Sequence, residues 1–126
     1  MKVEVDYATR ADLAAVGTVP HCRVSALAGR SPEGQVIGVG GLAYAADGRV
    51  FAWADLTEEA RKHPVALHKA GLRAMRMARE SGLRRLVATT DLSVTPAGAR
   101  WLARLGFKRE EACGAEIWVW RNDDLP

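Results

Sequence analysis

Residues 35–54, QVIGVGGLAYAADGRVFAWA, predict a long β-hairpin near the middle of the chain. Residues 35–45 and 49–54 are rich in valine, aromatic and other apolar residues, as strands are. The Asp47-Gly48 dipeptide between them is typical of a tight hairpin turn. Three further glycines lie inside the first strand and not between a strand and a helix, so they indicate a bulge or a close backbone approach rather than a phosphate-binding loop: Gly38, Gly40 and Gly41.

The residues before this hairpin predict a strand, a short helix and a second strand. Residues 2–7 alternate between charged and apolar side chains, which is the pattern of a strand. Thr9 followed three positions later by Asp12 matches a capping box at the start of a helix. Gly17 is a typical helix stop, and residues 23–28 read as the next strand.

The residues after the hairpin predict two helices and three strands. A polar segment that includes Thr57 is expected to form at most a turn of helix. A helix over residues 65–81 has an apolar stripe, Pro64 in its first turn and Gly82 as its stop. The other expected elements are a strand at 85–90, a helix that begins at Thr95-Pro96 and ends at Gly106, and closing strands at 107–110 and 116–121. The order β-α-β-β-β-α-β-α-β-β predicts an α+β domain over residues 1–126, with helices flanking a mixed, mostly antiparallel central sheet.

The composition is that of one folded domain. The chain has 126 residues, of which 48% are hydrophobic and 26% charged. No apolar run is long enough to span a membrane and the first residues have no signal core, so we expect a cytoplasmic protein with no membrane partner. Cys22 and Cys113 have no Cys or His cluster around them, and we expect two reduced, at least half-buried thiols and no metal site.

The formal net charge is +3, too small to predict a nucleic-acid partner. Basic residues are nevertheless concentrated between Arg61 and Arg85, where they would attract an anionic ligand. Lys69, Arg73 and Arg76 form a basic stripe on the predicted helix. This stripe is either a solvated helix face or a site for a phosphate or a partner.

The order of elements resembles that of the GNAT N-acetyltransferase superfamily. Residues 99–107, ARWLARLGF, resemble the family's late helix, which ends in a Leu-Gly-Phe turn. Residues 61–66, RKHPVA, look like the family's pyrophosphate loop before the central helix. The resemblance extends from about Lys2 to Arg121 and implies an acyl-CoA N-acyltransferase fold.

The resemblance also implies that acetyl-CoA is the cosubstrate. A helix N-terminus offers unpaired N–H groups and partial positive charge, which favours phosphate binding. The residues implied near the coenzyme A phosphates are Arg61, Lys62, His63, Val65, Ala66 and Lys69. Backbone groups of the strand before them would hold the pantetheine arm, at Ala52, Trp53 and Ala54.

Two carboxylates are implied to lie near the cleft where the central strands separate. Asp55 ends one of these strands and Asp91 follows the other. Either could hold the substrate ammonium or take its proton. The alternative interpretation is that each caps a local turn.

Three positions depart from the family's pattern. Pro64 stands where the loop has its first glycine, Leu102 where the late helix has a tyrosine, and Thr95 near a frequent asparagine. Two hypotheses therefore remain. One is an acetyltransferase that moves the acetyl group directly to a small-molecule or protein amine, in a chain that could form a homodimer. The other is a catalytically inactive binding or assembly module with the GNAT fold, for example in a phage particle.

Overall fold

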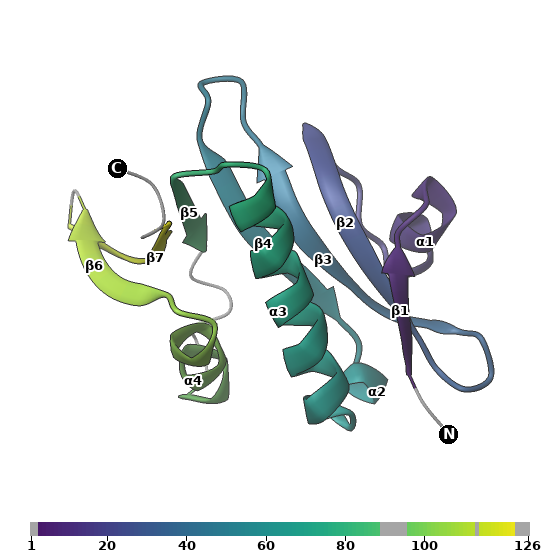
Figure 1. Cartoon of the computed structure of the whole chain (residues 1–126). Coiled ribbons are helices and arrows are strands. Elements are labelled where there is room, and N and C mark those ends of the chain that lie inside the picture. Colours follow the sequence, from purple (N-terminus) through teal and green to yellow (C-terminus); the bar gives the residue numbers. More distant parts are fainter. Residues whose placement is uncertain (1–2, 89–95, 113, 123–126) are drawn as a thin grey trace.

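The computed structural model describes residues 3–88, 96–112 and 114–122, which form one mixed β-sheet with helices on both faces (Figure 1). The strand order is β1-β2-β3-β4-β5-β7-β6. Every neighbouring pair is antiparallel except β4 and β5, which are parallel. The strands are β1 (Glu4–Tyr7), β2 (Arg23–Arg30), β3 (Val36–Tyr44), β4 (Val50–Leu56), β5 (Arg85–Ala88), β6 (Lys108–Ala112) and β7 (Ala115–Arg121). This arrangement confirms the mixed, mostly antiparallel sheet expected from the sequence.

The helices divide the core into two parts, one on each face of the sheet. The helices are α1 (Arg10–Ala15), α2 (Glu58–Arg61), α3 (Pro64–Glu80) and α4 (Pro96–Arg104). On the face covered by α3 and α4, Met75, Leu102 and Trp120 pack with residues of β3, β4 and β5 (Figure 1). On the face covered by α1, Leu13 packs against Ala26, Ala28 and Val39.

The predicted capping box starts α1, and its Asp12 carboxylate also forms an ion pair with Arg30. The Thr9 hydroxyl accepts a hydrogen bond from the Asp12 N–H, and the Asp12 carboxylate accepts one from the Thr9 N–H. Arg30 Nη2 donates to both oxygens of the buried Asp12 carboxylate, at 2.7 and 2.8 Å. The Thr9 N–H, followed by the Arg30 guanidinium, lowers the pKa of Asp12 below its ordinary value. The capping box therefore ties α1 to β2.

The central hairpin forms as expected, and its glycines serve close backbone contact. Gly48 turns at φ +89°, and the Ala45 N–H donates to the Arg49 carbonyl at 2.9 Å. A Cβ atom at Gly41 would lie 2.0 Å from the Ser25 carbonyl oxygen, which no side chain permits. The register between β2 and β3 also contains a bulge beside Gly38. Both interpretations of the glycine-rich strand are therefore confirmed.

Some boundaries and one side chain differ from the expectations. β2 and β4 run to Arg30 and Leu56, beyond the predicted ends, because both pair with β3 along their length. Cys22 is exposed in the segment before β2, so the expectation of a buried thiol is wrong there; Cys113 lies outside the described residues. No helix in the described part of the chain is long and apolar enough to cross a membrane.

Candidate active site

Among the described residues, the two parallel strands pair only over the first part of β4. The register of β4 with β5 contains Phe51↔Val87 and Ala52↔Ala88. β4 continues to Leu56, where β3 still pairs with it on one side, and no described strand pairs with it on the other. Within the described residues, the backbone N–H and C=O groups on that edge of β4 have no strand partner, and such groups need a hydrogen-bond partner. Trp53 and Ala54 lie on the open segment, and Ala52 lies at its last paired position.

The N-terminus of α3 lies close to the end of β4, with the short helix α2 between them (Figure 1). His63 is the N-cap residue and makes no side-chain capping hydrogen bond. Pro64 follows in the first turn, where its lack of an N–H removes no intrahelical bond. The first intrahelical donor is Leu67, whose N–H bonds the His63 carbonyl at 3.0 Å. The N–H groups of Val65 and Ala66 are therefore without an intrahelical acceptor and carry the positive end of the helix dipole.

A carboxylate that the sequence analysis missed lies among the basic residues of this region. Glu59 Oε2 is 3.2 Å from Lys62 Nζ, and Glu59 Oε1 is 3.6 Å from His63 Nε2. The hydrogen bond from Lys62 is the largest of the effects that lower the pKa of Glu59. The available signal was the spacing of Lys62 and His63, three and four positions after Glu59. Glu59 therefore offsets part of the positive charge predicted for this segment, while Arg61 remains exposed.

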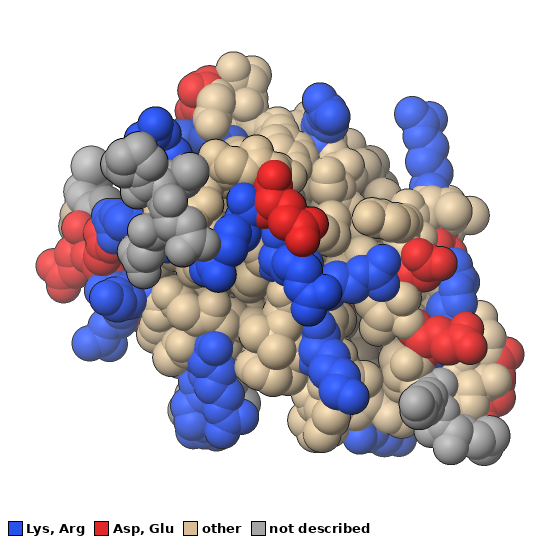
Figure 2. All heavy atoms as spheres, viewed as in Figure 1, with Lys and Arg blue, Asp and Glu red and all other residues tan. Residues whose placement is uncertain are grey.

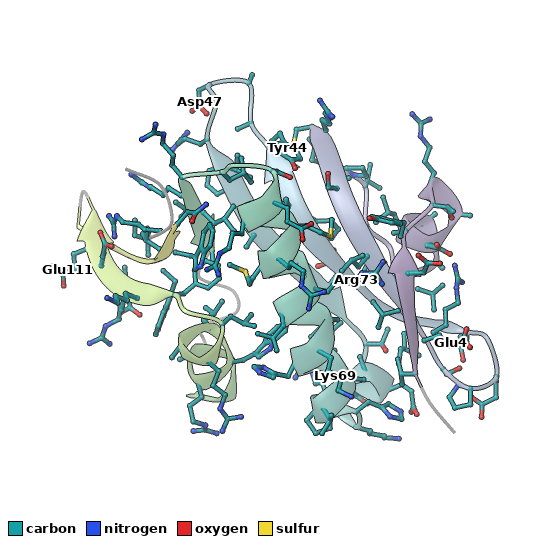
Figure 3. All side chains as sticks on the ribbon, viewed as in Figure 1. Glu4, Tyr44, Asp47, Lys69, Arg73 and Glu111 are labelled. Carbon is teal, nitrogen blue, oxygen red and sulfur yellow. The ribbon has the colours of Figure 1, made fainter. Side chains whose placement is uncertain are left out.

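The basic stripe of α3 contains two exposed residues, Lys69 and Arg76, and one structural residue, Arg73. Lys69 is exposed on the first half of the helix, whereas Arg73 reaches toward β1 (Figure 3). Arg73 Nη1 donates to the Val5 carbonyl at 2.9 Å, and its guanidinium lies 5.3 Å from the Tyr7 ring centroid. Figure 2 shows Lys and Arg side chains along α3 and around α4, with acidic side chains mostly toward the outer strands.

An apolar cavity of about 100 Å³ lies between α3 and the sheet. Its lining comes from β4 at Ala52 and Ala54, from α3 at Ala66 and Ala70, and from other apolar residues of β1 to β3 and α4. The Arg73 bond to Val5 ties the helix to the strand at the β1 end of the cavity.

The helix α4 contributes no acid at the position where the resembled family has a tyrosine. Leu102 is 2% exposed and belongs to the core. The neighbouring Trp101 lines the cavity, and its indole Nε1 is buried with no hydrogen-bond partner in the part of the chain that the structure describes. A buried donor without an acceptor is costly, so this N–H can serve a ligand.

Asp55 lies on the opposite face of the sheet from α3. Side chains alternate along β4, so Asp55 is on the same side as Trp53, which packs with the core beneath α1. Its carboxylate accepts a hydrogen bond from the Thr18 hydroxyl. Asp91, the second predicted carboxylate, and Thr95 lie outside the described residues. The structure thus brings together the open edge of β4 and the N-terminus of α3, with Asp55 at the end of the same strand.

No protein-family model and no curated protein matches the sequence. Solved structures do match. An acetyltransferase of the GNAT family from Staphylococcus aureus superposes with a TM-score of 0.74 at 7% identity, over 97% of this chain and 100% of that chain. A GNAT superfamily phosphinothricin acetyltransferase from Sinorhizobium meliloti, in complex with AcCoA, superposes with a TM-score of 0.69 at 15% identity, over 94% of this chain and 86% of that chain. A GNAT family N-acetyltransferase from Escherichia coli, in complex with CoA, superposes with a TM-score of 0.68 at 15% identity, over 98% of this chain and 83% of that chain. The chain therefore has the GNAT acyltransferase fold that its sequence led us to expect.

Proposed function

We propose that the protein is an N-acyltransferase that uses acetyl-CoA and transfers the acetyl group directly to an amine. The observation that carries this proposal is the opening between β4 and β5 beside the uncapped N-terminus of α3. Structural neighbours with this fold hold AcCoA or CoA in their crystals.

The phosphates of coenzyme A would lie at the start of α3. The N–H groups of Val65 and Ala66 point out of the helix end and favour an anion. Arg61, Lys62 and Lys69 add positive charge around them, and His63 can donate a hydrogen bond. The pantetheine arm would then run along the open edge of β4, where backbone groups of Ala52, Trp53 and Ala54 can bond its amides.

The acceptor amine would approach from the face that carries Asp55. The substrate ammonium must lose a proton before its nitrogen attacks the thioester carbonyl carbon, and Asp55 would hold the ammonium or take that proton. A C–N bond then forms, the C–S bond breaks, and the second proton of the amine nitrogen passes through water to the coenzyme A thiolate. Leu102 is buried and cannot supply that proton. Positioning of the amine and thioester would supply much of the rate.

Isothermal titration of acetyl-CoA into the protein tests the cofactor site. We expect micromolar binding that is lost in an Arg61→Ala/Lys62→Ala double variant. The matched control is Lys108→Ala/Arg109→Ala, which removes the same charges from β6, where both residues are exposed. Turnover of acetyl-CoA with a panel of small-molecule and peptide amines then tests transfer. Equal loss of binding in both double variants would contradict the assignment of the loop.

A second candidate function is a binding or assembly module, for example in a phage particle, that keeps the fold and does not catalyse. Two observations favour it: the buried Leu102 at the tyrosine position and Pro64 in place of a loop glycine, which removes one N–H donor. Binding of coenzyme A without turnover at high protein concentration would support this candidate. Size measurement in solution would show whether the chain is a homodimer.

A further inference from the structure

We propose that the cavity beneath α3 binds the hydrocarbon chain of an acyl-CoA, so that the protein accepts short aliphatic acyl groups longer than acetyl. The inference rests on the proposed function, because it extends the donor site of the same reaction. It assigns a role to a space that an acetyl group leaves unused.

The chemical character of the cavity selects a hydrocarbon. The described residues that line it are apolar or glycine, apart from His63 and the indole N–H of Trp101; the side chain of Trp53, which is also among the lining residues, packs on the α1 face of the sheet. Aliphatic side chains surround the interior, including Val5, Leu27 and Leu105. An apolar space of this kind favours an apolar ligand, because binding there removes hydrocarbon surface from water. A charged or strongly polar group would lose its hydration there without gaining partners.

The space is kept open by small residues on the helix. Ala66, Ala70 and Ala74 recur every four residues on α3, so they lie on one face of the helix, and all three line the cavity. Leucine has nearly the same helix propensity as alanine, so helix formation does not require alanine at these positions. Opposite them, Gly40 cannot be replaced by a larger residue, because its Cβ would lie 2.8 Å from the Trp53 carbonyl oxygen.

The cavity borders the segment of β4 that we assign to the pantetheine arm, which carries the thioester at its end. Ala52 and Ala54 line the cavity, and they also belong to the segment of β4 assigned to the pantetheine arm. A chain that continues beyond the carbonyl carbon can therefore enter the cavity without leaving the site. The buried, unpartnered Nε1–H of Trp101 in the same wall fits the carbonyl oxygen that begins such a chain.

The volume limits the length of the chain. A cavity of about 150 Å³ holds benzene with its six carbons, so the roughly 100 Å³ here corresponds to about four added carbons. Hexanoyl-CoA carries four methylenes more than acetyl-CoA. Decanoyl-CoA exceeds the available space.

The first test is titration of the wild-type chain with CoA and with acetyl-, butyryl-, hexanoyl- and decanoyl-CoA. We expect affinity to rise by about fourfold per buried methylene up to hexanoyl-CoA, with no further gain for decanoyl-CoA. Equal affinity for all the acyl-CoAs, or a fall from acetyl to butyryl, would overturn the proposal.

Two pairs of variants test whether the gain in affinity with chain length arises in the cavity. Ala74→Leu fills the cavity and should remove the gain with chain length while acetyl-CoA still binds; Ala103→Leu, on the exposed face of α4, should keep the gain. Should Ala74→Leu not fold, as a thermal melt would show, the smaller Ala70→Val replaces it.

Trp101→Phe should weaken the binding of every acyl-CoA by about fivefold and leave the binding of CoA unchanged. Its control is Trp118→Phe, whose Nε1 is also buried and unpartnered but which does not line the cavity.

A probe without coenzyme A separates this inference from the proposed function. The probe is the hexanoyl thioester of N-acetylcysteamine, titrated while the NMR signals of the alanine methyl groups are followed. Shifts of the methyl signals of Ala66, Ala70 and Ala74 in a protein that does not bind CoA would support the hydrocarbon site and overturn the cofactor assignment. Binding of CoA without these shifts would overturn the hydrocarbon site alone, and absence of both would overturn both.

Discussion

The Thr18 hydroxyl donates a hydrogen bond to Asp55, and this bond joins the segment after α1 to the end of β4. The two residues are 37 positions apart in the sequence. Asp55 is exposed, so its carboxylate also remains accessible to an amine from solvent. Thr18 therefore orients the carboxylate that we assign to the acceptor.

Replacement of Asp55 should separate chemistry from cofactor binding. We expect Asp55→Asn to lower kcat/KM for the amine by about 100-fold or more, since positioned general bases contribute at least that much. Thr18→Val should cost less, because the carboxylate is kept and only its orientation is lost. Steady-state kinetics with varied amine, together with acetyl-CoA titration, checks both. Weaker acetyl-CoA binding in Asp55→Asn would place the residue in the cofactor site instead.

Removal of the Glu59 carboxylate should strengthen anion binding at the start of α3. Lys62 and His63 both lie near this carboxylate, and Glu59→Gln would leave the Lys62 charge and the hydrogen-bond donors of both residues for a phosphate. We expect acetyl-CoA to bind about two- to fivefold more tightly, with a steeper dependence on salt. Titration at two salt concentrations measures this effect. Glu58→Gln, on the same short helix, makes the same change in net charge and should have a smaller effect.

The Asp12–Arg30 ion pair predicts part of the dependence of stability on pH. The pKa of Asp12 is lower in the folded chain than in the unfolded chain. This carboxylate therefore stabilises the fold above the ordinary value of 3.8 and loses that contribution as the pH falls below it toward the folded value. Urea unfolding of wild type and Asp12→Asn between pH 7 and pH 2 should show a smaller loss of stability in the variant.

Arg30 can be tested separately at neutral pH. Arg30→Met leaves the Asp12 carboxylate buried without its cationic partner, which should cost about 3 kcal/mol of unfolding free energy. The Thr9 capping hydrogen bonds remain in this variant and keep part of the stabilisation. A cost below about 0.5 kcal/mol would show that the guanidinium contributes no more than a surface pair.

Two glycines of the hairpin should differ sharply in their tolerance of alanine. At Gly41 a Cβ would overlap the Ser25 carbonyl, so Gly41→Ala should prevent folding or cost several kcal/mol. At Gly48 a Cβ meets nothing within 4 Å, and only the backbone at φ +89° opposes it, so Gly48→Ala should cost about 1 kcal/mol. Thermal unfolding of the two variants checks the contrast. Similar melting temperatures would contradict the close approach of β2 and β3.

The features that the sequence predicted are those that short segments specify. The Thr9 capping box, the Gly48 turn and the helix stop at Gly106, with φ +99°, each depend on a few neighbouring residues. The apolar stripe of the long helix likewise depends on spacing alone. These local signals, in the right order, were enough to indicate the fold and the segment at the start of α3.

The features that could not be predicted depend on residues far apart in the chain. Nothing in the spacing of Asp12 and Arg30 indicates that they meet, because the contact depends on the register of β2. The cavity beneath α3 arises from small residues on several elements, none of which is unusual alone. The sequence places Arg73 in a basic stripe on the helix. Its hydrogen bond to the Val5 carbonyl depends on β1 lying beside α3, which local spacing does not indicate. Cys22 is exposed at a bend in the segment between α1 and β2, just before β2 begins.

The short parallel register between β4 and β5 has a mechanical consequence. It divides the sheet into two antiparallel plates, β1 to β4 and β5 to β6, joined through Phe51↔Val87 and Ala52↔Ala88. Packing across the boundary comes from side chains, since Leu42 and Trp120 belong to the same core. We expect the sheet to bend most easily along this line, and a molecule bound between β4 and β5 to stiffen it.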